Sequence, residues 1–264
     1  MARMPSFFIS HGGGPWPWLP RWRAEFAPLE QSLRDMPAQL PEVPRALLVV
    51  SGHWESDVFS VMSAARPPMV YDYHGFPPET YEISYPATGA PDLANDAAAL
   101  IADAGLAVRM DDTIGFDHGT FAPLAVMYPK ADVPVFQVSL RADYDPEAHL
   151  ALGRALAPLR DKGVVIIGSG LSYHNLRLMN ASAREPSEAF DEWLTAALDE
   201  APEARSKTLL HWEDAPHARV CHAQEDHFMP IFAALGAAEA EPATRIYHQK
   251  GIFGGVTASG WRFG

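Results

Sequence analysis

Continuous apolar runs along the chain predict a sheet whose central strands are buried on both faces. Four such runs cover residues 6–10, 45–50, 133–140 and 163–168, and β-branched or aromatic residues dominate them. Each of the first, second and fourth runs leads into a segment rich in glycine and serine. Strands without alternation between apolar and polar positions are typical of parallel sheets covered by helices.

Between and after these runs, the spacing of apolar positions predicts helices and two late strands. The helices are expected at residues 92–104, 146–159, 187–198 and 226–235, and the strands at 244–249 and 254–263. Ser187 is a plausible N-cap, although Phe190 stands where a capping box has an acid. Alternating strands and helices predict an α/β fold with a mostly parallel central sheet flanked by helices.

The length and composition of the chain indicate a single domain. The chain has 264 residues, of which 48% are hydrophobic and 20% charged, the balance of a globular protein. No linker, repeat or shift in composition divides it. We therefore expect a single domain over residues 1–264, which is within the usual size for an α/β fold.

Net charge and cysteine content indicate which classes of binding partner and which cellular compartment to expect. A net charge of −13 repels phosphate backbones, and no cluster of lysine and arginine suggests an anionic membrane surface, so neither nucleic acid nor membrane is an expected partner. No apolar run approaches the roughly 18 residues that span a bilayer, and we find no signal peptide. Cys221 is the only cysteine, which fits a reducing cytoplasm.

The candidate functional residues are histidines. Of the eleven in the chain, His11, His53 and His174 each follow an apolar run and adjoin small residues. The carboxyl ends of strands in an open α/β sheet are where ligands bind, so these three side chains are expected to converge on one site. An isolated histidine of this kind is more often a structural residue, but the same placement three times favours a site.

Further histidines have weaker signals. His118 follows Asp117, which could orient its imidazole, although sequence neighbours often point apart. His74 stands in an aromatic and proline-rich loop and is expected at most to form a pocket wall. In the segment from His222 to His227 the two histidines are five residues apart, which is not the spacing of two zinc ligands on one helix. The remaining four are interpreted as surface or structural residues: His149, His211, His217 and His248.

Residue types alone leave the metal open. A set of imidazoles suits zinc, copper or iron, and the lack of clustered cysteines counts against a structural zinc site. The glycines after His11 are similar to an oxyanion loop, but no Gly-x-Ser-x-Gly elbow accompanies them, so a serine hydrolase is a weak interpretation.

Five motifs in the same order together resemble the class III extradiol ring-cleavage dioxygenases, most closely the DOPA 4,5-dioxygenase branch. They span most of the chain: Phe7-Phe8-Ile9-Ser10-His11-Gly12, Ser51-Gly52-His53-Trp54, Gly115-Phe116-Asp117-His118-Gly119, Ser172-Tyr173-His174-Asn175-Leu176 and Glu225-Asp226-His227-Phe228. The loop from Tyr73 to Ala87 is similar to that branch as well.

The resemblance implies a single α/β catalytic domain with one non-haem metal, functionally Fe(II), which zinc can replace in relatives. It implies His11, His53 and His227 as metal ligands. It implies either a ligand or an acid–base role for His174, and a catalytic role beside the metal for His118. The implied reaction cleaves a DOPA-like catechol with O₂ to a muconic semialdehyde, with His118 or His174 moving the proton.

The chain departs from the wider class in two places. His227 stands where protocatechuate-cleaving relatives have a glutamate ligand, and whether Glu225 substitutes is open. Three glycines and Pro15 follow His11 where many members have Gly-Ser-Pro, a change at the expected pocket floor.

Several questions stay open at this stage. Candidates for a dry pocket wall are Trp54, Tyr73, Phe116 and Phe228, although core packing is the commoner role of such residues. Two other functions are compatible with the same histidines: a zinc-dependent hydrolase, and a non-catalytic binding protein on the same fold. The sequence leaves the physiological catechol and the oligomeric state undetermined.

Overall fold

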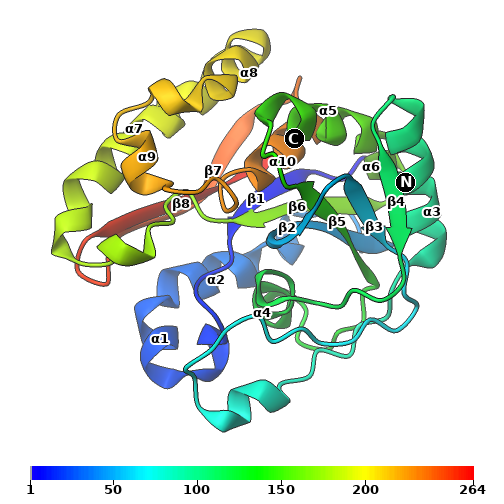
Figure 1. The fold of residues 1–264 in the computed structure, drawn as a ribbon, viewed down its shortest axis with the longest axis horizontal. Helices are drawn as coiled ribbons and strands as arrows, with labels where there is room; N and C mark the ends of the chain where they lie inside the picture. The colour runs from blue at the N-terminus through cyan, green and yellow to red at the C-terminus, as the bar shows by residue number, and fades with distance from the viewer. Residues whose placement is uncertain (1) are drawn as a thin grey trace.

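One eight-stranded sheet organises the molecule. The computed structural model describes residues 2–264, and its strands run in the order β4-β3-β5-β2-β6-β1-β8-β7 (Figure 1). The strands are β1 (Ser6–Ser10), β2 (Ala46–Ser56), β3 (Phe59–Met62), β4 (Val108–Asp111), β5 (Val135–Arg141), β6 (Val164–Gly170), β7 (Ala243–Ile252) and β8 (Val256–Phe263).

The middle of the sheet is parallel and its flanks are mixed. β1 pairs with β6, β6 with β2 and β2 with β5 in parallel, whereas β8 joins β1 and β7 in antiparallel fashion. Every residue of β1 and β6 is buried, as continuous apolar runs require. The expected fold class, α/β with a mostly parallel central sheet flanked by helices, is confirmed.

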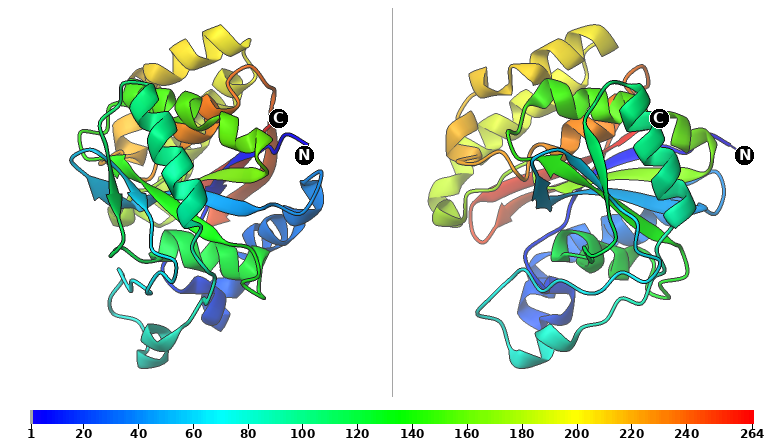
Figure 2. Two further views of the ribbon diagram at one scale, coloured as in Figure 1. Left: turned by 90° about the vertical axis from the view of Figure 1, so that its right-hand side faces the viewer. Right: turned by 45° about the vertical axis from the view of Figure 1, so that its right-hand side comes forward.

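Helices cover both faces of this sheet (Figure 2). They are α1 (Pro20–Glu25), α2 (Ala27–Asp35), α3 (Pro91–Asp103), α4 (His118–Met127), α5 (Pro146–Leu156), α6 (Pro158–Asp161), α7 (Arg184–Leu198), α8 (Pro202–Leu210), α9 (Ala218–Cys221) and α10 (Pro230–Ala237). α10 packs on β6, β1 and α5, while α4 packs on β2 from the other side together with α2. Within residues 2–264, no helix combines the length and the apolar character that crossing a membrane requires.

Three predicted helices have different bounds in the structure. The helix expected at 146–159 is divided, because Pro158 cannot continue the hydrogen-bonding of α5 and begins α6 instead. α7 begins at Arg184, so Ser187 is not an N-cap; its hydroxyl donates to the Arg184 carbonyl and accepts from the Thr257 amide. The helix expected from residue 226 begins only at Pro230, a residue suited to the first helical turn.

β2 extends past the predicted end of its apolar run, so His53 lies within the strand rather than after it. The pairing of β2 with β5 shifts register between Val50 and Glu55. Such an irregularity re-aims side chains at the end of a sheet. His53 is therefore carried by a distorted strand end instead of the turn that the sequence suggested.

A structural histidine gives a first testable prediction about pH. His149 is fully buried; its Nε2 accepts from the Arg141 amide at 3.1 Å and its Nδ1 donates to the Asp145 carbonyl at 2.7 Å. Burial, partly offset by that backbone hydrogen bond, lowers the pKa of His149 to about 4. Between an unfolded pKa of about 6.5 and this value, only the unfolded chain binds the proton. The neutral side chain thus contributes stability above pH ~6.5 that is lost as the pH falls toward 4.

The measurement is denaturant unfolding of the metal-free protein between pH 7 and 4.5. In the wild type, the free energy of unfolding is expected to fall with pH more steeply than in His149→Gln, by up to ~1.4 kcal/mol per pH unit for this one proton. Other buried histidines contribute to both proteins and cancel in the comparison. If the free energy of unfolding depended on pH identically in the two proteins, the lowered pKa of His149 would be contradicted.

Candidate metal centre

His11 stands at the carboxyl end of β1, in the middle of the sheet. Its amide donates to the Gly170 carbonyl at 3.1 Å, and the Trp16 indole donates to the His11 carbonyl at 2.7 Å. These bonds fix the backbone, whereas both ring nitrogens are buried without a hydrogen-bond partner. Buried polar atoms are rarely left unpaired, so these nitrogens indicate a ligand site.

A carboxylate that the sequence analysis did not identify bridges two of the predicted residues. One oxygen of Asp72 lies 2.8 Å from Nδ1 of His118, and the other lies 3.1 Å from Nδ1 of His53. Burial raises the pKa of Asp72, but the hydrogen bond from His118 and the charges of both histidines outweigh it, so the net pKa is below the ordinary value. Asp72 is therefore an anion that orients two imidazoles.

Asp117, the neighbour of His118 in sequence, has a different role. It is the N-cap of α4, accepting from the Thr120 amide at 3.0 Å and from the Ser51 hydroxyl at 2.7 Å. Burial, reinforced by the charge of Asp72, raises the pKa of Asp117 to about 6. Asp117 thus holds the start of the helix that presents His118, and the imidazole itself is oriented by Asp72.

A second carboxylate orients the histidines from the other side. Oδ2 of Asp226 accepts from Nδ1 of His227 at 2.8 Å, and Oδ1 lies 3.8 Å from Nδ1 of His174. The ring of His174 stacks on that of His227, with 3.4 Å between centroids and 19° between planes. Asp226 therefore orients His227 through a hydrogen bond, whereas its second oxygen is near His174 but has no hydrogen-bond partner.

Glycines at the end of β6 bring the His227 segment against the sheet. A Cβ atom on Gly170 would lie 2.1 Å from the His227 carbonyl, and one on Gly168 would lie 2.1 Å from the Pro230 carbonyl. The Leu171 amide donates to the same His227 carbonyl at 2.9 Å. The small-residue turn noted in the sequence thus admits the protein's own backbone, which carries His227 to the end of β1 and β2.

His53 and His227 meet at the centre of the cluster, with 3.1 Å between their Nε2 atoms. Since a carboxylate can only accept, Asp72 and Asp226 favour the proton on Nδ1 of each ring, which leaves a lone pair on each Nε2. Two lone pairs at this distance repel unless a cation lies between them. With metal–nitrogen distances of about 2.0–2.1 Å, two ligands of one ion are separated by about 3 Å.

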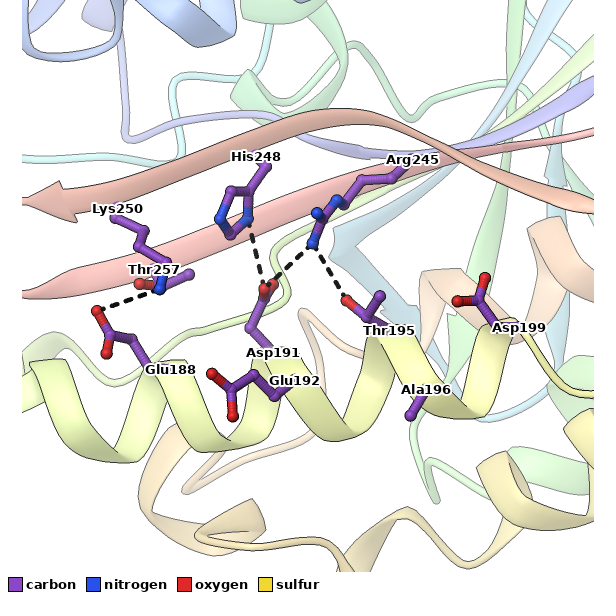
Figure 3. A pocket seen from close by; sticks show the side chains of 10 residues that line it. All are labelled: Glu188, Asp191, Glu192, Thr195, Ala196, Asp199, Arg245, His248, Lys250 and Thr257. Carbon is purple, nitrogen blue, oxygen red and sulfur yellow. Dashed lines mark hydrogen bonds and ion pairs between the residues drawn. The ribbon is translucent and has the colours of Figure 1, made fainter.

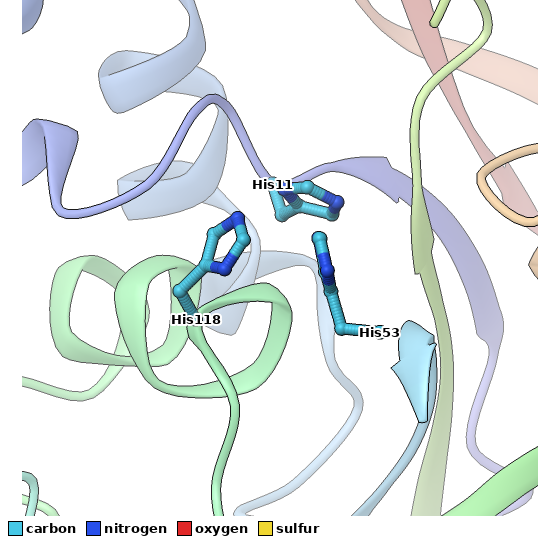
Figure 4. Close-up of side chains that lie close together, drawn as sticks. All are labelled: His11, His53 and His118. Atoms are coloured by element: carbon cyan, nitrogen blue, oxygen red, sulfur yellow. The ribbon is translucent and has the colours of Figure 1, made fainter. Parts of the chain in front are cut away.

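The ring of His11 completes this arrangement. Its centroid lies 4.9 Å from that of His53 and 5.1 Å from that of His227. Figure 4 shows His11, His53 and His118 turned toward one another, and their donor nitrogens lie within 4.8 Å of each other. A second such group consists of His174, Asp226 and His227. The residues therefore fit a metal ion, and the nitrogen set favours zinc, iron or copper over magnesium.

Burial prepares these imidazoles for metal binding. It lowers the pKa of His11 and His227 well below the ordinary value, and the neighbouring histidines lower both further. Burial together with the charge of His118 lowers the pKa of His53 to about 3. Near neutral pH the three rings are thus neutral and offer lone pairs instead of competing protons.

A cavity of about 640 Å³ opens onto the cluster. All five predicted site histidines line it, as do Asp72, Asp226 and the loop residues Tyr73 and His74. His74 thus forms part of the wall, as expected. Of the other wall candidates, Trp54, Phe116 and Phe228 do not line the cavity and belong to the hydrophobic core.

Other candidates lie outside the centre. Glu225, considered as a possible third ligand, forms an ion pair with Arg219 at 2.9 Å instead. His222 precedes the turn, as expected, but it is fully buried and its Nε2 donates to the Ser172 carbonyl at 3.1 Å. These two side chains explain the density of polar residues in the motif without contributing to the site.

A second cavity, of about 400 Å³, lies between α7 and β7 (Figure 3). Its charged groups compensate one another: Asp191 lies 3.4 Å from His248 and 3.8 Å from Arg245, and Lys250 lies 3.6 Å from Glu188. His248 therefore has a local structural partner, as the sequence suggested for it. The two unpartnered ring nitrogens of His11 belong to the first cavity, not to this one.

Comparisons with known proteins agree with this geometry. Residues 11–264 match the family model described as the catalytic LigB subunit of aromatic ring-opening dioxygenase. The chain is 39% identical to the dioxygenase tasH of Hapsidospora irregularis, over 94% of this chain and 82% of that protein. It is 35% identical to a 4,5-DOPA dioxygenase extradiol of Beta vulgaris, over 98% and 96% of the two chains.

Bacterial proteins show the same relationship. A 4,5-DOPA dioxygenase extradiol of Escherichia coli K12 is 33% identical over 92% of this chain and 89% of its own length. The crystal structure of an uncharacterized Escherichia coli K12 protein superposes with a TM-score of 0.79 at 29% identity, covering 99% of this chain and 100% of that one. The expected resemblance is confirmed: the chain belongs to the LigB family of class III extradiol dioxygenases, and it is an oxidoreductase of the dioxygenase type.

Proposed function

We propose that this protein is an Fe(II)-dependent extradiol dioxygenase that cleaves the ring of a catechol with O₂ to give a muconic semialdehyde. The observation that carries the proposal is the pair of Nε2 atoms, of His53 and His227, that lie 3.1 Å apart beside the unpaired nitrogens of His11. Zinc suits the same three nitrogens and is expected to occupy the site after some preparations. The buried single cysteine, Cys221, accords with a cytoplasmic location.

His11, His53 and His227 are the proposed ligands. When bound, a non-haem metal with three protein ligands provides open positions for substrate and dioxygen and stabilises negative charge on both. The protein contributes neutral imidazoles, and Asp72 and Asp226 strengthen two of them as donors by accepting their Nδ1 protons. The three proposed ligands carry no charge themselves, and the carboxylates closest to them are Asp72, beside His53, and Asp226, beside His227.

His118 is the proposed proton acceptor. Its Nδ1–H donates to Asp72, so Nε2 carries the lone pair that can take a proton from a catechol hydroxyl. The adjacent carboxylate stabilises the imidazolium that results, and the ring can return the proton at a later step. The α4 N-terminus, fixed by Asp117, holds His118 at the cavity wall.

His174, which lines the same cavity, is assigned to the same proton chemistry. It groups with His227 and Asp226, not with His11 and His53. Burial lowers its pKa, against the opposing effect of the Asp226 charge. A neutral imidazole stacked on a ligand ring is suited to exchanging a proton with a bound substrate. The alternative role that the resemblance allows, direct metal ligation, remains a prediction that metal analysis of His174→Ala can test.

Oxygen uptake tests the proposed function. Protein purified without oxygen is loaded with Fe(II), mixed with a panel of catechols and exposed to air. We expect one O₂ consumed per catechol and a yellow semialdehyde, with neither signal in a His53→Ala control. No uptake with any catechol, together with O₂-independent hydrolysis of esters or amides by the zinc form, would contradict the proposal.

A further inference from the structure

Resting on the proposed function, we infer that the preferred substrate is a catechol with an uncharged, apolar substituent, bound against a built aromatic wall, and not one with a carboxylate side chain such as DOPA. The substituent would occupy the part of the cavity away from the metal centre. A substrate of this kind differs from the DOPA-like catechol that the family resemblance implies.

The charges around the cavity oppose an anionic substituent. Among its lining residues, all of which lie in the described part of the chain, there is no lysine or arginine, whereas Asp72 and Asp226 are both present. Arg177 follows the lining residue Leu176 but does not itself line the cavity. A carboxylate placed away from the metal centre would lose water without gaining a lysine or arginine partner, which costs several kcal/mol. The lining imidazole outside the metal cluster is that of His74.

Among the residues that line the cavity, the buried carboxylate oxygen left without a hydrogen bond is Oδ1 of Asp226, and that atom is buried away from a cationic substituent. The side chains of Asp72 and Asp226 are only 19% and 16% exposed, and each already serves the imidazoles of the metal centre. Pairing either carboxylate with a substrate ammonium would weaken the orientation of His118 or His227. The side chain of an amino acid, which carries both charges, is therefore poorly matched to this cavity.

One part of the cavity lining is aromatic. We define it as Trp22, Phe26, Phe76 and Phe253, all of which line the cavity. The ring of Trp22 is edge-on to Phe76 at 5.5 Å and to Phe253 at 5.4 Å between centroids, and Phe26 is edge-on to Phe253 at 5.6 Å. Interlocked rings of this kind form a rigid apolar surface that favours an apolar substituent.

Unusual backbone features hold this wall in place. A Cβ atom on Gly13 would lie 2.7 Å from the Trp22 ring, and one on Gly14 would lie 2.9 Å from Phe76. Phe253 has a φ of 49°, uncommon for a residue with a side chain, and its amide donates to Glu25 at 2.7 Å. The glycines that depart from the usual family motif thus make room for the aromatic wall beside the metal centre.

The experiment compares two catechols that share one carbon skeleton. 4-Propylcatechol ends in a methyl group where 3-(3,4-dihydroxyphenyl)propanoate has a carboxylate; 4-(2-aminoethyl)catechol and L-DOPA extend the comparison to an ammonium and to both charges. Calorimetry on Zn(II)-loaded protein without oxygen gives Kd, and oxygen uptake by the Fe(II) form gives kcat/KM. We expect 4-propylcatechol to bind at least ~30-fold more tightly than each charged compound and to show a similar advantage in kcat/KM.

Substitutions in the cavity lining test whether these residues cause the preference for an apolar substituent. Met179→Lys places an ammonium at the apolar lining and is expected to shift the Kd ratio at least ~10-fold toward the propanoate. Phe253→Ala should weaken 4-propylcatechol ~10-fold or more while changing unsubstituted catechol little. Arg177→Ala, the control, should leave all ratios unchanged.

The outcomes separate this inference from the proposed function. If a charged catechol binds as tightly as 4-propylcatechol and is cleaved, the function stands and the substrate inference is overturned. If Arg177→Ala abolishes binding of a carboxylate, the inference is likewise wrong, because that arginine then serves the cavity. If no catechol binds or is cleaved, the proposed function fails, and the inference fails with it.

Discussion

Replacing His53 with alanine is expected to lower the affinity for Fe(II) or Zn(II) by more than about 100-fold, the upper cost of losing even an outer-shell partner of a ligand. The reason is geometric, since His53 supplies one of the two Nε2 atoms that face each other at 3.1 Å. The change also leaves Asp72 with one imidazole instead of two. Metal per chain, measured after anaerobic loading and desalting, should fall close to zero.

His211→Ala is the matched control, because His211 is an exposed histidine that does not line the cavity. It should bind one metal per chain with wild-type affinity. Circular dichroism of the metal-free proteins distinguishes loss of a ligand from loss of the fold. A folded His53→Ala protein that retains a full metal complement would remove His53 from the ligand set.

Replacing His118 with alanine should leave the metal in place and lower kcat by a factor of ~10² to 10⁴, the range for losing acid–base assistance. His118 is held by Asp72 at 2.8 Å and lies beside the proposed ligands, with its ring centroid 5.3 Å from that of His11. The measurement is steady-state oxygen uptake at matched metal content.

Asp72→Asn provides the accompanying positioning variant. The amide keeps the shape but removes the charge that stabilises a protonated His118, so the pH profile of kcat should change along with the rate. His174→Ala under the same conditions shows how the proton transfer is shared between His118 and His174. A wild-type rate in His118→Ala would move the acid–base role to His174.

The positions of the central strands and the convergence of the histidines that follow them could be predicted from the sequence for the same reason. A central parallel strand is apolar throughout, so β1 and β6 are visible as runs, and the residues that follow such runs lie at one edge of the sheet. That argument places His11 and His174 beside one cavity, and the structure does bring them there. Their individual roles stay predictions, since placement alone does not distinguish a ligand from a proton carrier.

Features without periodicity could not be predicted. α4 is buried almost all round and contains Pro123, so it has no amphipathic pattern to indicate a helix. Asp72 stands in a loop with no regular structure, and only the fold brings it to within hydrogen-bonding distance of His118, 46 residues away in sequence. No local signal distinguishes this aspartate from a surface residue.

Acidic residues next to a site histidine in the sequence did not reliably predict which carboxylate orients its imidazole. Asp117 precedes His118 but its carboxylate is directed to Ser51 and to the helix N-terminus, because an N-cap side chain folds back on its own helix. Glu225 is likewise near His227 in sequence and is bound to Arg219. The one carboxylate that orients the imidazoles of both His53 and His118, Asp72, comes from a distant loop, whereas Asp226 orients its own sequence neighbour, His227.

The position of β1 has a consequence for how the protein matures in the cell. The strand nearest the N-terminus pairs with β6 on one side and β8 on the other, which end at residues 170 and 263. During synthesis, β1 and the histidine after it wait unpaired until most of the chain has left the ribosome, and closing such long loops is slow. His11 can meet His227 only after the chain has been made as far as residue 227. Because the three proposed ligands span residues 11 to 227, we expect the complete metal site to form late in synthesis, after β6 has become available to pair with β1.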